Sequence, residues 1–201
     1  MYDEEFWDDR YRSHTAVWSG NPNPQLVAEV ADLPPGTALD VGCGEGADTL
    51  WLTSRGWQVT GVDFAPTALA RAAAQAEKLG VAVRLVHADL VTWVPDRAYD
   101  LVSAHFMHLP TEDRVPLFAR LAAAVAPGGT LLLVGHDRSD LETTAGRPDL
   151  PDWFFTAAET AAALDEGWTV EVADRRPREA LDPDGRTITI HDAIMRATRV
   201  R

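Results

Sequence analysis

Ala38-Leu39-Asp40-Val41-Gly42-Cys43-Gly44-Glu45-Gly46 is the stretch that decides the fold of this chain. Its apolar run breaks abruptly into three glycines at alternate positions. A second apolar run, from Trp57 to Val62, ends in Asp63. This order predicts a strand, a tight glycine turn into a helix, and a second strand that ends in a carboxylate. Such a unit is typical of a pocket for the adenosine part of a cofactor.

The positions of Asp40 and the glycines favour one class of cofactor. In the dinucleotide pattern G-x-G-x-x-G the third glycine lies one residue later than Gly46 does here. A carboxylate at position 40 would repel a pyrophosphate and would suit an ammonium or sulfonium group. S-adenosylmethionine carries both cations and no phosphate. The alternative, a nicotinamide-dependent oxidoreductase, is disfavoured further because no Tyr-x-x-x-Lys pair exists. The only lysine is Lys78, and the residue four positions before it is Ala74.

Strands and helices alternate outward from this unit. We expect strands at 37–41, 57–62, 81–87, 99–104 and 130–135, and helices at 25–31, 47–55, 66–79 and 112–125. Apolar strands that alternate with helices predict an α/β fold with a parallel sheet covered on both faces. Two last runs, 168–173 and 187–198, flank the turn residues Asp182-Pro183-Asp184-Gly185 and predict an antiparallel pair at one end of the sheet.

Both ends of the chain differ from this core. The spacing of Phe6, Trp7 and Tyr11 predicts a short helix with an aromatic face. Thr156 opens a capping-box helix that ends near Leu164. Residues 136–155, before this helix, have no periodicity, and a loop of this length is typical of a lid, a binding loop or a disordered segment. We therefore expect a single domain, 1–201, with an N-terminal aromatic cap (1–34), a cofactor-binding half (35–135), and a substrate-side half with the C-terminal hairpin (136–201).

The composition of the chain indicates which kinds of partner it can bind and in which cellular compartment we expect it. The net charge of −13 argues against a nucleic-acid or anionic-membrane partner. The basic run Arg175-Arg176-Pro177-Arg178 is flanked by acids, so we interpret it as a solvated strand end. Cys43 is the only cysteine, which excludes an internal disulfide. The acidic N-terminus is no signal peptide and no apolar run could span a bilayer, so we expect a cytoplasmic protein. The preference for arginine over lysine suggests a bacterial source.

The chain resembles the class I S-adenosylmethionine-dependent methyltransferases. The resemblance covers about 35–135 and is carried by Leu39 to Gly46, Val62-Asp63, Ala88-Asp89-Leu90, Tyr99-Asp100-Leu101-Val102 and Leu121 through Pro127-Gly128-Gly129-Thr130. It implies a Rossmann-like three-layer sandwich with a mostly parallel seven-stranded sheet whose last strand is antiparallel. The N-terminal segment (Phe6-Trp7-Asp8-Asp9-Arg10-Tyr11, Trp18 and Asn23-Pro24) is loosely similar to the tellurite-resistance and thiopurine branch. There, an aromatic segment folds over the cofactor.

The resemblance also implies roles for single residues. The methionine end of the cofactor would be held by the loop residues Asp40, Gly42, Cys43, Gly44 and Gly46, where the Cys43 side chain is a small packing group between the glycines. Asp63 would bind the ribose, or would only cap the next helix. Phe64, Asp89 and Leu90 would hold the adenine, although an aspartate such as Asp89 is also a common turn residue. Tyr11 and Trp18 would stack on ligand or would only anchor the N-terminal segment.

Methyl transfer from a sulfonium is an in-line displacement that mainly requires alignment and exclusion of water. Candidate bases are His105, His108 and His136, at or just past expected strand ends. We rank His105 first, because the resemblance places the loop after the fourth strand beside the transferring methyl. The same position implies that His105 also contacts the cofactor. Trp153-Phe154-Phe155 would line an acceptor pocket or anchor the loop.

Nucleic-acid-methylating relatives have an Asn/Asp-Pro-Pro-aromatic motif where this chain has Ser103-Ala104-His105-Phe106.

These observations predict methyl transfer from S-adenosylmethionine to a small-molecule acceptor through an O, N, S or C atom that the sequence does not specify. S-adenosylhomocysteine would be the product. The acids Asp137, Asp140 and Asp149 form no clear ligand set, so we expect no metal. A nicotinamide-dependent oxidoreductase and a non-catalytic S-adenosylmethionine-binding protein are the alternatives.

Overall fold

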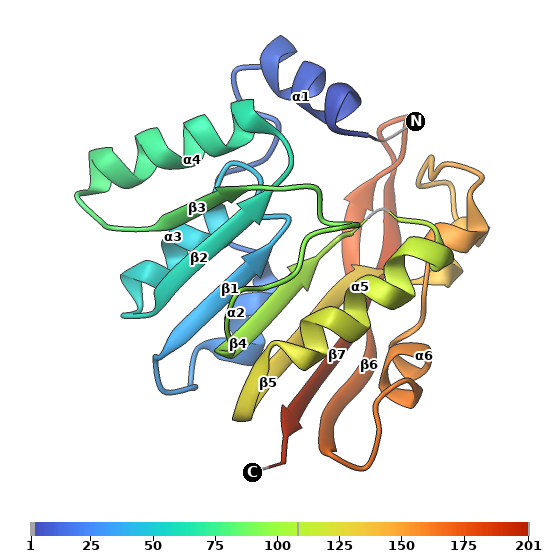
Figure 1. Ribbon diagram of the computed structural model, residues 1–201. Coiled ribbons are helices and arrows are strands. Elements are labelled where there is room, and N and C mark those ends of the chain that lie inside the picture. Colours follow the sequence, from blue (N-terminus) through green and yellow to red (C-terminus); the bar gives the residue numbers. More distant parts are fainter. Residues whose placement is uncertain (1–2, 108, 201) are drawn as a thin grey trace.

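A computed structural model describes residues 3–107 and 109–200 as a sheet with helices on both faces (Figure 1). The helices are α1 (Glu4–Ser13), α2 (Pro24–Val30), α3 (Ala47–Ser54), α4 (Pro66–Leu79), α5 (Thr111–Ala123) and α6 (Ala157–Ala162), with short 3-10 turns η1 (Arg138–Glu142) and η2 (Pro151–Trp153). The strands are β1 (Thr37–Val41), β2 (Gln58–Asp63), β3 (Arg84–His87), β4 (Tyr99–His105), β5 (Val125–His136), β6 (Trp168–Leu181) and β7 (Thr187–Arg199).

The sheet has seven strands in the order β3-β2-β1-β4-β5-β7-β6. Strands β1 to β5 pair in parallel, and β7 is antiparallel to both of its neighbours. This arrangement confirms the predicted α/β sandwich, the antiparallel last strand and the C-terminal hairpin. Helices α2 and α3 cover one face through a cluster that includes Leu26 and Leu52, whereas α5 packs on the other face through Leu117 and Leu121.

The chain reverses its direction of travel across the sheet at β1, which lies between β2 and β4. In open α/β sheets, ligands bind beyond the carboxyl ends of the strands at such a switch point. Figure 1 shows α1 lying above this edge of the sheet. Helix α4 packs against β2 and β3, and α1 packs against α4. The fold therefore brings the N-terminal segment over the loop that follows β1.

Several predicted element boundaries are wrong. Strand β3 begins at Arg84, three residues later than expected, because only four residues pair with β2. Strand β5 begins at Val125 and includes the Pro-Gly-Gly run that we expected to precede it. Strand β6 continues to Leu181, eight residues past the predicted end at position 173, because β7 pairs with it along its whole length.

The basic run in β6 is consequently not a strand end. Arg176 forms an ion pair with the buried Glu29, and Arg178 pairs with the buried Asp192 at 2.9 Å. These two arginines are occupied by structural ion pairs inside the protein. Among the residues that the structure describes, no helix is long and apolar enough to cross a membrane.

Candidate functional site

The loop after β1 has a backbone conformation that glycine favours. Gly42, Gly44 and Gly46 have φ angles of +72°, +52° and +87°, in the left-handed region. The amides of Gly42 and Cys43 both donate to the carbonyl of Val62 in β2, at 2.8 and 3.1 Å. A Cβ on Gly46 would lie 2.8 Å from the Cβ of Ala72, so a side chain there would force α3 and α4 apart.

Two of the glycines face other segments of the chain. A Cβ on Gly42 would lie 2.9 Å from Sδ of Met107, which follows β4. A Cβ on Gly44 would lie 3.1 Å from the Tyr11 hydroxyl and 3.6 Å from Nε1 of Trp18. The loop thus meets the post-β4 segment on one side and the N-terminal segment on the other.

Asp63, at the carboxyl end of β2, is fixed by two backbone amides. One oxygen accepts a hydrogen bond from Gly44 and the other from Ala65, each at 2.8 Å. Burial raises the pKa of Asp63, and these hydrogen bonds oppose the shift. The carboxylate therefore ties the glycine loop to the start of α4. Its second bond goes to the amide of the N-cap residue Ala65 and not to an amide of the first helical turn, so Asp63 does not cap α4 as the alternative interpretation expected.

Asp40 is buried near the end of β1, and the Thr49 hydroxyl donates to it at 2.6 Å. Burial above all, and the neighbouring Asp48 carboxylate, raise the pKa of Asp40 to about 7, while the Thr49 hydrogen bond and the nearby His105 oppose the shift. In the described part of the chain, neither Asp40 nor Asp63 forms an ion pair. Two buried carboxylates beside a glycine loop fit a ligand that brings cations and hydroxyl groups, as S-adenosylmethionine does.

His105 ends β4 and its Nδ1 lies 2.8 Å from Oδ2 of Asp48 in α3. The side chains of His105 and Asp48 are only 8% and 15% exposed. Nε2 of His105 is buried and has no hydrogen-bond partner among the described residues. Asp48 is the acid in the first turn of α3, and no local sequence pattern marks it as a site residue.

The N-terminal segment is fastened over the loop by Glu45 and Arg71. One oxygen of Glu45 accepts from the amides of Val17 and Trp18, and the other pairs with Arg71 at 2.6 Å. Arg71 also donates to the carbonyl of Tyr11 at 2.6 Å. The buried Tyr11 hydroxyl accepts from Nε1 of Trp18 at 3.0 Å. Both predicted aromatic residues therefore lie at the loop and also anchor the segment.

The predicted adenine-side residues lie along the same edge of the sheet. Leu90 is buried, and Phe64 is half-buried with its carbonyl 2.9 Å from Nε2 of His87. Asp89 is exposed, and its carboxylate accepts from the amide of Val91 at 2.9 Å within its own turn. The geometry of Asp89 is thus that of a turn residue, and its adenine contact stays a prediction.

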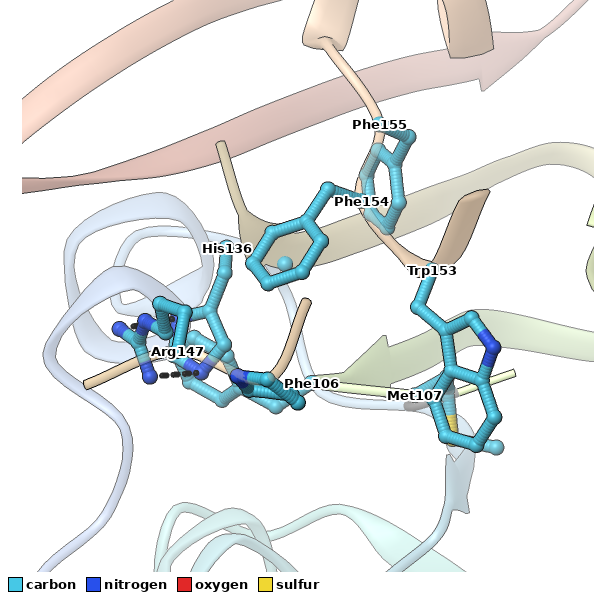
Figure 2. Close-up of a pocket in the computed structure, with 9 residues that line it drawn as sticks. Phe106, Met107, His136, Arg147, Trp153, Phe154 and Phe155 are labelled. Atoms are coloured by element: carbon cyan, nitrogen blue, oxygen red, sulfur yellow. Dashed lines mark hydrogen bonds between the residues drawn. The ribbon is translucent and has the colours of Figure 1, made fainter. Parts of the chain in front are cut away.

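A separate pocket lies beyond the ends of β4 and β5 (Figure 2). Its apolar wall consists of aromatic side chains and a thioether, contributed by Phe106, Met107, Trp153, Phe154 and Phe155. His136 and Arg147 also line it, and the guanidinium nitrogens of Arg147 lie 3.0 and 3.1 Å from the two ring nitrogens of His136.

The two predicted catalytic histidines are therefore in different places. His136 lines this pocket, where its ring centroid lies 4.6 Å from that of Phe106. His105 does not line it and pairs with Asp48. His108, the third candidate, lies outside the described residues. Within residues 3–107 and 109–200, no group of three or more His, Cys, Asp or Glu side chains is placed to hold a metal ion.

Residues 38–129 match a family described as a methyltransferase domain. Trans-aconitate 2-methyltransferase of Rhizobium meliloti is 38% identical over 126 residues, which are 61% of this chain and 47% of that protein. The chain thus spans about half the length of the curated relatives it matches.

Solved structures share the whole fold. One, described by the words "Conversion of a Disulfide Bond into a Thioacetal Group during Echinomycin Biosynthesis", is 26% identical with a TM-score of 0.76 and covers 98% of this chain and 91% of that one. TehB from Haemophilus influenzae is 22% identical with a TM-score of 0.77 and covers 98% and 67%. Residues 38–129 therefore match a methyltransferase domain, and the strand order and fold of the chain are shared with these solved structures.

Proposed function

We propose that the chain binds S-adenosylmethionine along the carboxyl ends of β1 and β2 and transfers its methyl group to a small-molecule acceptor. The observation that carries the proposal is the glycine loop between Asp40 and Asp63, two buried carboxylates without an ion-pair partner in the described chain. The bound cofactor supplies a methyl group that is already activated by its sulfonium. The protein then has to orient the acceptor and exclude water.

The described residues divide this work between two regions. Asp40 and the glycine loop would hold the methionine end of the cofactor, and Asp63 the ribose. The N-terminal segment, fastened by Glu45 and Arg71, would cover the cofactor from water. The aromatic pocket around His136 would bind the acceptor, with His136 as the candidate base.

The three-part division at 1–34, 35–135 and 136–201 follows from this assignment. A small acceptor, in place of a nucleic acid, is supported by the net charge of −13 and by an arginine run in β6 that forms internal ion pairs. The related trans-aconitate 2-methyltransferase is named for a small-molecule acceptor as well. We also propose that the protein is bacterial and cytoplasmic, a compartment that suits its single cysteine, which is free and buried.

Calorimetry with S-adenosylhomocysteine tests the proposal. We expect micromolar binding of S-adenosylhomocysteine and no binding of NAD; the reverse result would overturn the methyltransferase assignment in favour of an oxidoreductase. Labelled S-adenosylmethionine screened against phenols, thiols, halides and amines then separates an enzyme from a protein that only binds the cofactor.

Asp63→Asn tests the ribose assignment. An amide nitrogen at this position would face the N–H of Gly44 or Ala65, and one acceptor would be lost. We expect S-adenosylhomocysteine to bind at least about tenfold more weakly. Asp100→Asn is the matched control, because Asp100 also accepts from a backbone amide, that of Thr37, at the opposite end of β1. Unchanged affinity in Asp63→Asn would mean that Asp63 only ties the glycine loop to the start of α4.

A further inference from the structure

The Asp48 carboxylate is held on both of its oxygens. Oδ1 accepts from the amide of Asn23 at 2.6 Å, just ahead of α2. Oδ2 lies 2.8 Å from Nδ1 of His105. Because both partners approach from different elements, the carboxylate has a fixed position and can hold the imidazole ring in one orientation.

This contact selects one tautomer of His105. A carboxylate only accepts hydrogen bonds, so Nδ1 of the ring carries the proton. Nε2 of the neutral ring is then a hydrogen-bond acceptor. The His105 side chain is more than nine-tenths buried, and its Nε2 has no hydrogen-bond partner among the described residues. Buried polar atoms are normally satisfied, so this nitrogen points to a ligand that donates a hydrogen bond.

The position of His105 in the sheet indicates which donor. Asp40 in β1 lies in register with Ser103 in β4. His105 is two residues past Ser103, so its side chain is on the same face as that of Asp40 and closer to the carboxyl edge. The hydroxyl of Ser103 also lacks a partner among the described residues. A cationic donor at this place would meet the Asp40 carboxylate and the Nε2 lone pair together.

We propose that Asp48 is a positioning residue that holds His105 with its proton on Nδ1, so that Nε2 accepts a hydrogen bond from the α-ammonium group of the cofactor beside the Asp40 carboxylate. The inference rests on the proposed function for the identity of the ligand. It makes His105 a cofactor-binding residue and leaves the acceptor side to His136.

Two ligands separate this role from general effects on the fold. S-adenosylhomocysteine has the α-ammonium group, whereas 5′-methylthioadenosine keeps the adenosine and the sulfur without the amino-acid end. His105→Asn retains an amide near the position of Nδ1, and His105→Gln retains one near the position of Nε2. We expect His105→Asn to bind S-adenosylhomocysteine at least about tenfold more weakly and methylthioadenosine within about twofold of the wild type. His105→Gln should restore most of the lost affinity.

Asp48→Asn tests the positioning. Its amide can donate to Nδ1, which would move the ring proton to Nε2 and weaken S-adenosylhomocysteine binding by the same order. Asp32→Asn, which removes an exposed carboxylate just beyond the end of α2, is the charge-matched control and should bind like the wild type. Proton–nitrogen correlation spectra of protein labelled with nitrogen-15 in histidine identify which ring nitrogen of His105 is protonated. We expect Nδ1 in the wild type and in Asp32→Asn, and Nε2 in Asp48→Asn.

Three outcomes would contradict the proposal. A wild-type His105 that is protonated on Nε2 would overturn the tautomer assignment, whatever the protein binds. Equal loss of affinity for both nucleosides in His105→Asn would mean a structural role. If the wild type binds neither nucleoside, the proposed function fails, whereas binding of S-adenosylhomocysteine that His105→Asn leaves unchanged contradicts this inference alone.

Discussion

At the scale of single residues, the site depends on carboxylates that are buried before any ligand binds. Burial disfavours the charged form of such a group, and the pKa of Asp40 accordingly rises to about 7. An ammonium group placed against Asp40 favours its ionised form and lowers this pKa again. Binding of the cofactor is therefore coupled to loss of a proton wherever the free protein holds Asp40 partly protonated.

We predict proton release when S-adenosylhomocysteine binds near pH 6.5, and an affinity that rises as the pH increases from about 6 to about 8. Calorimetry in two buffers with different ionisation enthalpies measures the released protons. Asp40→Asn should abolish the release, while Asp32→Asn, on the exposed surface, should retain it. A binding enthalpy that does not depend on the buffer in the wild type would contradict the prediction.

The residues that the sequence could identify are those whose role is local. The left-handed glycines and Asp40 belong to one short motif, so their geometry follows from adjacent residues. The Asp48–His105 pair joins positions 57 apart, and the Glu45–Arg71 pair joins positions 26 apart. Such pairs depend on how α3 meets β4 and how α4 meets the loop, which no local pattern encodes.

At the scale of elements, the same difference between local signals and long-range contacts explains which helix and strand boundaries the sequence predicts. Helix α4 has the predicted limits, because Pro66 begins it and Gly80, with a φ of +66°, ends it. Strand β6 exceeds its prediction because the run after position 173 is charged and contains Pro177. The strand is at the edge of the sheet, where a proline is tolerated, and the partners of its arginines come from α2 and β7.

The N-terminal segment is the element whose attachment can be tested separately. Arg71 reaches Glu45 and the carbonyls of Tyr11 and His14, and its side chain is 27% exposed. We expect Arg71→Met to speed hydrogen exchange of the amides in 4–18 by about tenfold or more, since charged hydrogen bonds at part-buried sites contribute about 1.5–3 kcal/mol. Binding of S-adenosylhomocysteine should weaken a few-fold.

Arg84→Met is the matched control for this variant. Arg84 also forms a single ion pair, with Asp96 at 2.7 Å, but the pair is half exposed and lies on β3 away from the glycine loop. It should leave exchange in 4–18 and nucleoside binding unchanged. If Arg71→Met behaves in the same way, the segment is held without Arg71, by the Glu45 hydrogen bonds to Val17 and Trp18 and by the packing of Tyr11 on Ala65 and Ala68.

At the scale of the whole molecule, one edge of the sheet carries two regions. The glycine loop, Asp63 and the N-terminal segment gather at β1 and β2, and the aromatic pocket gathers beyond β4 and β5 (Figures 1 and 2). The segment after β4 joins them, because Met107 lines the pocket and also lies against Gly42. An acceptor in the pocket would thus lie next to the methionine end of the cofactor.

This arrangement predicts that cofactor binding and acceptor choice can be changed independently. We expect Trp153→Ala and Arg147→Met to bind S-adenosylhomocysteine within about twofold of the wild type, because both residues line the aromatic pocket beyond β4 and β5. Both should change which acceptors are methylated in the labelled screen, since they remove an aromatic wall and the cation of the pocket. Trp51→Ala, at a half-buried tryptophan packed on the α3 side of the core, controls for loss of an indole. If the two pocket variants lose cofactor affinity and keep the acceptor profile, the pocket belongs to the cofactor site.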